Sequence, residues 1–261
     1  MTCGALWLRA GPEFVVALMS ILLAHEMGHY LACRHYGVDA TLPFFIPAPL
    51  IGPAYTLGAF IRIRGPIPHR RALFDIGIAG PLAGFLVCLP VLWLGMMEAT
   101  VGPLPERPMR DPPFGEPLLF QWATALTIGT VPEGQTLYIG PYGLAAWFGL
   151  LVTALNLMPV GQLDGGHVTH ALLRQRSVVV SRLGILACVG LLYLRPTWML
   201  WTILLLVLAR RPHPATLADH LPVGKARVFV GLLGLAVFVL SFTPSPFIVS
   251  WAEFLGAFTS R

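Results

Sequence analysis

The chain has 261 residues, of which 56% are hydrophobic and 11% are charged, and its mean hydropathy is +0.74. Soluble domains average about 45–50% apolar and about 25% charged residues, so these values exclude a soluble enzyme and a disordered chain. The formal net charge of +5 comes from basic residues in short clusters between apolar runs, which is typical of membrane-protein loops. We therefore predict an integral membrane protein that contacts a lipid bilayer and no nucleic acid.

Six apolar segments are candidates to cross the hydrocarbon layer of a bilayer, which takes about 17–25 helical residues. They run from about Pro12 to Cys33, Arg71 to Met97, Tyr142 to Met158, Val178 to Leu194, Thr197 to Ala209 and Val228 to Phe242. The fifth is short, and we expect it to be tilted or partly buried. The sequence thus predicts an all-α polytopic membrane protein with about six transmembrane helices. We expect one membrane-embedded domain over residues 1–261, with a core at about 12–176 and additional transmembrane helices at 177–261.

The segment between the first two spans, Thr41 to Pro68, is apolar but too rich in proline to form a helix. Its stretch Tyr55 to Arg64 alternates loosely in polarity, which favours a strand. Non-helical backbone at membrane depth persists only where protein or water satisfies it. We predict a re-entrant hairpin or sheet that lines a cavity, with a plain surface loop as the alternative. Further on, Glu98 to Glu116 is predicted as a polar loop, and Leu118 to Thr130 as an interfacial or re-entrant piece.

Most of the 17 basic residues fall in the loops after the first, third and fifth spans. Loops rich in arginine and lysine stay in the cytoplasm, which places both termini on the opposite side of the membrane. The N-terminus shows neither the basic stretch and cleavage site of a signal peptide nor a transit peptide rich in serine and arginine. We expect a bacterial cytoplasmic membrane, with a mature plastid protein as the alternative.

Chemically active side chains appear at the end of the first span, in AHEMGHYLACRH. His25 and His29 are four residues apart, so a helix presents both on one face, close enough to share a metal. Glu26 lies between them and can reach a water molecule at that metal. Ionisable residues inside an apolar span are costly and mark function by default. In the alternative, the histidines form hydrogen bonds to neighbouring helices and Glu26 stays protonated.

A hydrolytic zinc site needs a third protein ligand, with a fourth position left to water. The candidates near the membrane are Asp75, Asp164, His167 and His170. Asp164 is favoured because it follows the third span in NLMPVGQLDGGHVTH, where Pro159 and Gly161 break the helix. A carboxylate on such a broken helix can reach a metal held by the first span. The two later histidines are interpreted as polar members of the next helix that could compete as ligands.

The motifs HEMGH and NLMPVGQLDGG together resemble the site-2 protease family, the intramembrane zinc metalloproteases. FDIGIAGPLAGF is similar to the small-residue motif of that family's second core helix. The run HPATLADHLPVGKARVFVGLLGLAVFVLSFTPSPF resembles the end of a short branch that includes plastid homologues. The resemblance covers the core from about Pro12 to Arg176. The better-known members carry a PDZ domain, and we expect none here, because the predicted loops leave no room for one.

The resemblance implies that His25, His29 and Asp164 bind one Zn²⁺ ion per chain. Glu26 is then the general base, which takes a proton from water and later passes it to the leaving amine. Asn156 is implied to hold the substrate backbone or the oxyanion, and a helix-to-helix hydrogen bond is the alternative.

Two glycines of the second motif, Gly80 and Gly84, are interpreted as small residues that let helices pack closely. The resemblance implies an intramembrane zinc-dependent endopeptidase that cuts single-span membrane proteins in or near their transmembrane segments, in regulated intramembrane proteolysis. A substrate helix must unwind before attack, and adding it as a strand to an exposed sheet edge would achieve that. A non-proteolytic metal-binding regulator or a transporter is the alternative. The complete set of ligands and base, and the lack of an internal repeat, favour the protease.

Overall fold

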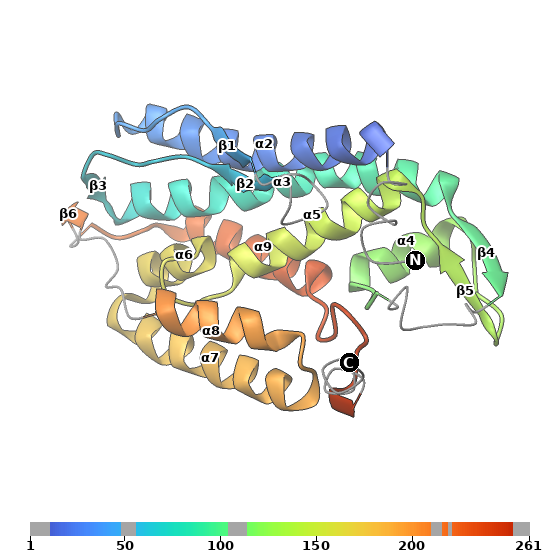
Figure 1. The fold of residues 1–261 in the computed structure, drawn as a ribbon. Coiled ribbons are helices and arrows are strands. Elements are labelled where there is room, and N and C mark those ends of the chain that lie inside the picture. Colours follow the sequence, from blue (N-terminus) through green and yellow to red (C-terminus); the bar gives the residue numbers. More distant parts are fainter. Residues whose placement is uncertain (1–10, 48–55, 104–113, 210–215, 219–220, 253–261) are drawn as a thin grey trace.

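A computed structural model describes residues 11–47, 56–103, 114–209, 216–218 and 221–252 (Figure 1). The helices are α2 (Gly11–His35), α3 (Arg70–Glu98), α4 (Leu118–Thr127), α5 (Pro141–Leu157), α6 (Asp164–Leu173), the short 3₁₀ helix η1 (Arg174–Arg176), α7 (Ser177–Leu194), α8 (Trp198–Leu208) and α9 (Lys225–Ser241). The strands are β1 (Phe44–Pro47), β2 (Thr56–Phe60), β3 (Ile67–His69), β4 (Thr100–Pro103), β5 (Gln135–Tyr138) and β6 (Thr216–Ala218). The described part of the chain is mostly helical, with small sheets.

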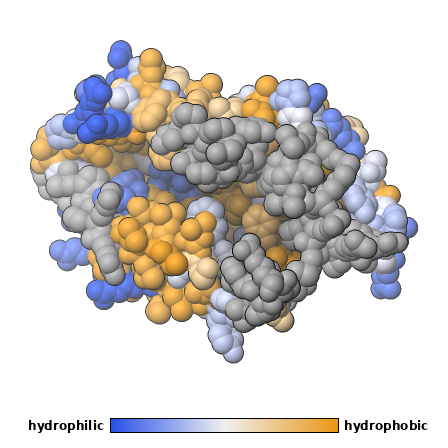
Figure 2. Space-filling model, in the orientation of Figure 1, coloured by the Kyte–Doolittle hydropathy of each residue, from blue (hydrophilic) through white to orange (hydrophobic). Residues whose placement is uncertain are grey.

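Three helical stretches are long and apolar enough to cross a membrane: Gly11–His35, Arg70–Glu98 and Asp164–Leu194, the last of which joins α6, η1 and α7. Helices α4, α5 and α8 are apolar but shorter. Figure 2 shows apolar side chains over the middle of the molecule, while hydrophilic side chains gather toward its two ends. An apolar surface between polar ends suits a bilayer, and together with the three long apolar helices it confirms that this is a membrane protein.

The predicted spans agree with helices α2, α3, α5, α7, α8 and α9 to within a few residues. The prediction of a helical fold with one hairpin or sheet between the first two spans is confirmed in part, because the described residues form that sheet, β1–β2, and two further two-stranded sheets that were not predicted. The predicted polar loop opens with β4, which pairs antiparallel with β5. Strands of four residues are too short to produce a clear alternation in the sequence, which is why they escaped prediction. The predicted interfacial piece is helix α4.

Helices α2, α3 and α5 pack against one another at the centre of the fold, and small residues let them approach closely. A Cβ atom added to Gly28 of α2 would overlap the backbone of Ala79 in α3. On α5, a Cβ atom at Gly149 would lie 2.9 Å from Ile21 of α2 and 3.2 Å from the Cys88 sulfur of α3. Helix α9 packs against both α3 and α5, and α7 lies beside α8 (Figure 1).

The segment after α2 folds into a hairpin in which β1 and β2 pair antiparallel, with Phe45 opposite Ala59. An isolated bridge between Ala40 and Ile63 extends the pairing. The strand predicted between Tyr55 and Arg64 is therefore present as β2, which lies along α2. Tyr55 itself lies outside the described residues. Beyond the hairpin, β3 pairs parallel with β6 at one end of the molecule, and the β4–β5 sheet lies at the other end (Figure 1).

Candidate metal centre

Two buried histidines lie one turn apart on α2 and point to the same side. His25 is 4% exposed and His29 is 7% exposed, and their Nε2 atoms are 3.1 Å apart. The four-residue spacing produces this geometry directly, because residues i and i+4 share one face of a helix. The polar face of α2 is therefore turned toward the interior of the helical core.

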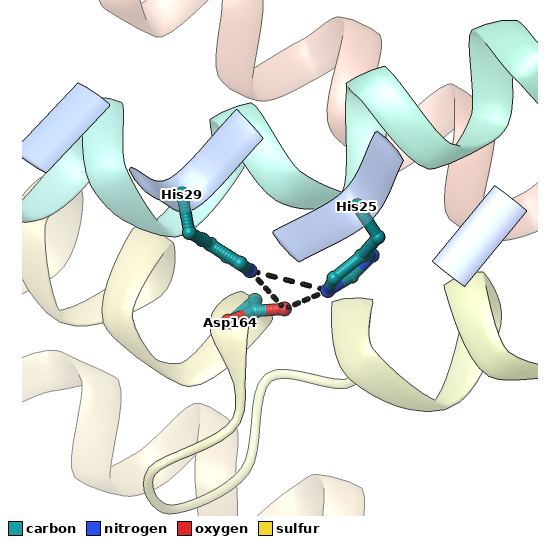
Figure 3. A group of neighbouring side chains, drawn as sticks. All are labelled: His25, His29 and Asp164. Carbon is teal, nitrogen blue, oxygen red and sulfur yellow. Dashed lines mark hydrogen bonds and ion pairs between the residues drawn. The ribbon is translucent and has the colours of Figure 1, made fainter. Parts of the chain in front are cut away.

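The third member of the site comes from a break between α5 and α6. Helix α5 ends at Leu157, and α6 begins at Asp164. Gly165 and Gly166 allow the chain to fold back tightly, since a Cβ atom on the first would overlap the carbonyl of Leu157 and one on the second would overlap the carbonyl of Gly161. The Oδ2 atom of Asp164 then lies 3.2 Å from Nε2 of His25 and 3.3 Å from Nε2 of His29 (Figure 3).

These three atoms have the spacing that a tetrahedral zinc ion requires. Zinc binds imidazole nitrogen and carboxylate oxygen at about 2.0–2.2 Å, so neighbouring ligands of a tetrahedron lie about 3.3–3.5 Å apart. The three separations of 3.1, 3.2 and 3.3 Å come within a few tenths of an ångström of that spacing. Two imidazoles and one carboxylate leave a fourth position for water or substrate, which is the arrangement of a hydrolytic site. The residues present fit a zinc ion.

Helix α3 orients the second histidine. The Nδ1 atom of His29 lies 2.7 Å from the carbonyl oxygen of Ile76. Since a carbonyl can only accept, Nδ1 carries the proton and donates, which leaves Nε2 free for a metal. Gly80, one turn further along α3, faces the same imidazole, and a Cβ atom there would overlap the ring. Gly84 faces His25 more loosely, with a Cβ atom 3.1 Å from that of the histidine.

Glu26 lies beside the three candidate ligands in a cavity of about 620 Å³. Its carboxylate accepts a hydrogen bond from the backbone N–H of Ile61, just after β2, and interacts electrostatically with His29 and Asp164. Asn156 of α5 adds a polar side chain to the cavity lining. The apolar part of the lining consists of Leu18, Leu22, Ala59, Phe60, Ile63, Phe148, Val152, Leu163 and Trp201. Water and a peptide group can therefore meet the candidate base and ligands in one apolar-walled space.

Asn156 lies next to the candidate ligands. Its Nδ2 atom is 3.4 Å from Nε2 of His25, so the side chain joins α5 to α2 and also faces the cavity. Both readings from the sequence, a helix-to-helix contact and a group that holds substrate, are compatible with this position.

The other sequence candidates lie outside the group of three. Among the described residues, the His, Cys, Asp and Glu side chains whose ligand atoms gather within 4.8 Å of one another are His25, His29 and Asp164. His167 belongs to α6 and lines the same cavity, and the Nδ1 atom of His170 lies 3.2 Å from Ser177 Oγ. Asp75 is paired with Arg227 of α9.

Two backbone groups at the site could not be found from residue types. They are the Ile76 carbonyl, which holds His29, and the Ile61 N–H, which holds Glu26. Gly80 did carry a signal, because it lies in the small-residue motif FDIGIAGPLAGF, but that motif was interpreted as helix packing alone. The structure adds that its glycine makes room for a candidate ligand.

Comparison with known proteins gives an independent result. Residues 13–194 match the pattern of Peptidase family M50. The chain is 30% identical over 251 residues to the probable zinc metalloprotease EGY1, chloroplastic, of Arabidopsis thaliana, covering 95% of this chain and 45% of that protein. It is 32% identical to the probable zinc metalloprotease EGY2, chloroplastic, of Oryza sativa subsp. indica, covering 91% of this chain and 45% of the other. The chain thus spans less than half the length of these relatives.

Proposed function

This chain belongs to peptidase family M50, the site-2 protease family, and on that premise we propose that it is an intramembrane zinc endopeptidase. Its substrates are single-span membrane proteins, cut in or near the transmembrane segment in regulated intramembrane proteolysis. The observation that carries the proposal is the convergence of His25, His29 and Asp164 with Glu26 in one cavity among apolar helices. His25, His29 and Asp164 hold one Zn²⁺ ion, and Glu26 is the catalytic residue.

The chemistry divides between the ion and the chain. When bound, zinc supplies a Lewis acid that polarises the scissile carbonyl and lowers the pKa of water toward about 7. The Glu26 carboxylate accepts a proton from the attacking water and delivers it to the leaving amine. The hydrogen bond from the Ile61 N–H fixes the direction of that carboxylate. Asn156, at the edge of the same space, donates to the substrate carbonyl or to the oxyanion that replaces it.

The hairpin gives the substrate a place to unwind. Ala59 and Phe60 of β2, with Ile61 and Ile63 just beyond, form one side of the cavity. A peptide that pairs with this segment would exchange its helical hydrogen bonds for inter-strand ones, which exposes its carbonyl groups to attack. Because Ile61 also contacts Glu26, a peptide bond held there lies next to the base. Apolar walls suit a substrate taken from the bilayer.

The membrane arrangement is also part of the proposal. Helices α2, α3, α5, α7, α8 and α9 form about six spans of a single membrane-embedded domain, with the core at 12–176 and additional helices at 177–261. The basic clusters of 62–71, 174–182 and 225–227 mark the cytoplasmic side, and the metal centre lies nearer to it. A bacterial cytoplasmic membrane stays a prediction, beside relatives whose names place them in chloroplasts.

The decisive experiment compares the purified chain with its Glu26→Gln variant. Each is analysed for zinc per chain and for cleavage of a model single-span substrate in detergent. We expect one zinc in both, and cleavage reduced at least 100-fold in the variant, because general acid–base catalysis contributes about 10²–10⁴-fold. Equal cleavage by both would overturn Glu26 as the base. Absence of zinc and of cleavage in both would favour a non-proteolytic membrane protein instead.

A further inference from the structure

Three polar side chains from distant parts of the sequence form a cluster near the end of α2. Arg227 of α9 donates two hydrogen bonds to the carboxylate of Asp75 in α3, from Nε to Oδ1 at 2.9 Å and from Nη2 to Oδ2 at 2.7 Å. Tyr36, directly after α2, donates its hydroxyl to the same carboxylate and accepts from Arg227 Nη2 at 3.1 Å. Burial raises the pKa of the Tyr36 hydroxyl, and the Asp75 contact adds to this, so the hydroxyl remains a donor. We call this cluster the Asp75 clamp.

The clamp lies next to the backbone group that orients a candidate zinc ligand. Asp75 immediately precedes Ile76, whose carbonyl accepts from His29 Nδ1. Tyr36 follows His29 by about two helical turns, just beyond the end of α2, so the α2–α3 interface is fixed at the candidate ligand and again at the clamp. The group that orients His29 is a backbone carbonyl, so a substitution at Ile76 does not remove it. The position of this carbonyl is set by the contacts that hold this turn of α3. At this turn of α3, a bidentate carboxylate–guanidinium pair holds it.

We propose that Asp75 is a positioning residue of the metal centre, clamped by Arg227 and Tyr36 so that the Ile76 carbonyl stays in place to orient His29. The inference rests on the proposed zinc site. It assigns a role to a carboxylate that sequence reasoning treated only as a candidate ligand. It also makes α9, which lies outside the segment matched by the family, a contributor to metal binding through Arg227.

The structure offers a matched control for this role. Arg71, four residues before Asp75 on the same helix, donates from Nε to the Pro222 carbonyl at 2.8 Å. It therefore ties α3 to the segment that leads into α9, as the clamp does, but it makes no described contact with Asp75 or Tyr36. Removing Arg71 loosens the same part of the chain without touching the carboxylate. A general loss of α9 docking is thus separable from a loss of the clamp.

The test measures zinc affinity of the full chain in detergent, by competition with a chelator of known affinity, together with thermal stability. For Asp75→Asn we expect zinc affinity about tenfold lower, the low end of the 10–100-fold that partners of ligating histidines contribute. Arg227→Met should show the same loss of zinc affinity. Arg227→Lys should recover part of it, because lysine keeps the charge but cannot form the bidentate pair. Arg71→Met should bind zinc with the parental affinity. Combining Asp75→Asn with Arg227→Met adds little further loss, since both changes break the same Arg227–Asp75 pair.

Should Asp75→Asn not fold, Tyr36→Phe removes the two hydrogen bonds of the Tyr36 hydroxyl and leaves the Arg227–Asp75 pair in place. We expect it to lower zinc affinity about threefold. Parental zinc affinity in Asp75→Asn or in Tyr36→Phe, or an equal loss in Arg71→Met, would overturn the positioning role. A parent chain that binds no zinc would overturn the proposed function, and this inference with it. Zinc affinity thus separates failure of the positioning role from failure of the proposed zinc site, because only failure of the zinc site is seen in the parent chain.

Discussion

At the scale of single residues, the closest constraint on the candidate ligands comes from Gly80. A Cβ atom there would overlap the imidazole of His29, whereas one at Gly84 would lie 3.1 Å from the Cβ of His25. We expect Gly80→Ala to displace the His29 ring and lower zinc affinity by about 100-fold, the upper end of the effect of disturbing a ligand's surroundings. Cleavage falls with it, while Gly84→Ala has a smaller effect on both.

Gly190→Ala on α7 is the matched control for that prediction, since nothing lies within 4 Å of its Cβ position and alanine is the better helix former. Its zinc binding should equal that of the parent, measured by the same chelator competition. Normal zinc affinity in Gly80→Ala would contradict a positioning effect and leave only the packing role that the sequence indicated for this glycine.

The three candidate ligands could be predicted from the sequence for two physical reasons. His25 and His29 follow from helical periodicity alone, which fixes their relative position without knowledge of the fold. Asp164 lies 135 residues after His29 in the sequence and was favoured by the helix-breaking residues around it and by the family motif. The hydrogen bonds to Ile61 and Ile76 were out of reach, because every residue has the same backbone groups and only tertiary packing selects which of them meet a side chain.

At the scale of elements, the apolar spans were predictable because length and hydropathy alone define them. The parallel pairing of β3 with β6 was not, since it joins three-residue segments almost 150 positions apart, and no local pattern encodes such a contact. The β1–β2 hairpin could be predicted only in part. Its proline-rich, apolar composition predicted non-helical backbone, but its contact with Glu26 needed the structure.

The hairpin carries a prediction of its own. Proline at Ala59, in β2, removes a backbone N–H and disturbs both the pairing with Phe45 and the segment proposed to hold substrate. We expect Ala59→Pro to lower cleavage of a single-span substrate about tenfold or more while zinc per chain stays at the parental value. In the control, Val101→Pro disturbs the β4–β5 sheet at the opposite end and leaves cleavage unchanged. Full cleavage by a folded, zinc-loaded Ala59→Pro chain would rule out strand addition at β2.

At the scale of the whole molecule, the candidate metal centre joins two parts of the chain that are distant in sequence. Its ligand atoms come from α2, near the start of the chain, and from the beginning of α6, and they lie within 4.8 Å of one another (Figure 3). A ligand that binds only the folded state stabilises it by about 4 kcal/mol at 1,000 times its dissociation constant. Bound zinc should therefore link α2 to α6 and raise the free energy of unfolding.

We accordingly expect chelation of zinc to lower the melting temperature of the detergent-solubilised chain by about 10 °C, given roughly 2–4 °C per kcal/mol for a protein of this size. Asp164→Asn, which lacks the α6 ligand, should melt at a lower temperature and show little further change with chelator. Thermal melting followed by tryptophan fluorescence, with and without zinc restored, measures both. An equal response to chelator in Asp164→Asn and in the parent would contradict the bridge, because the stabilising ion would then be held without Asp164.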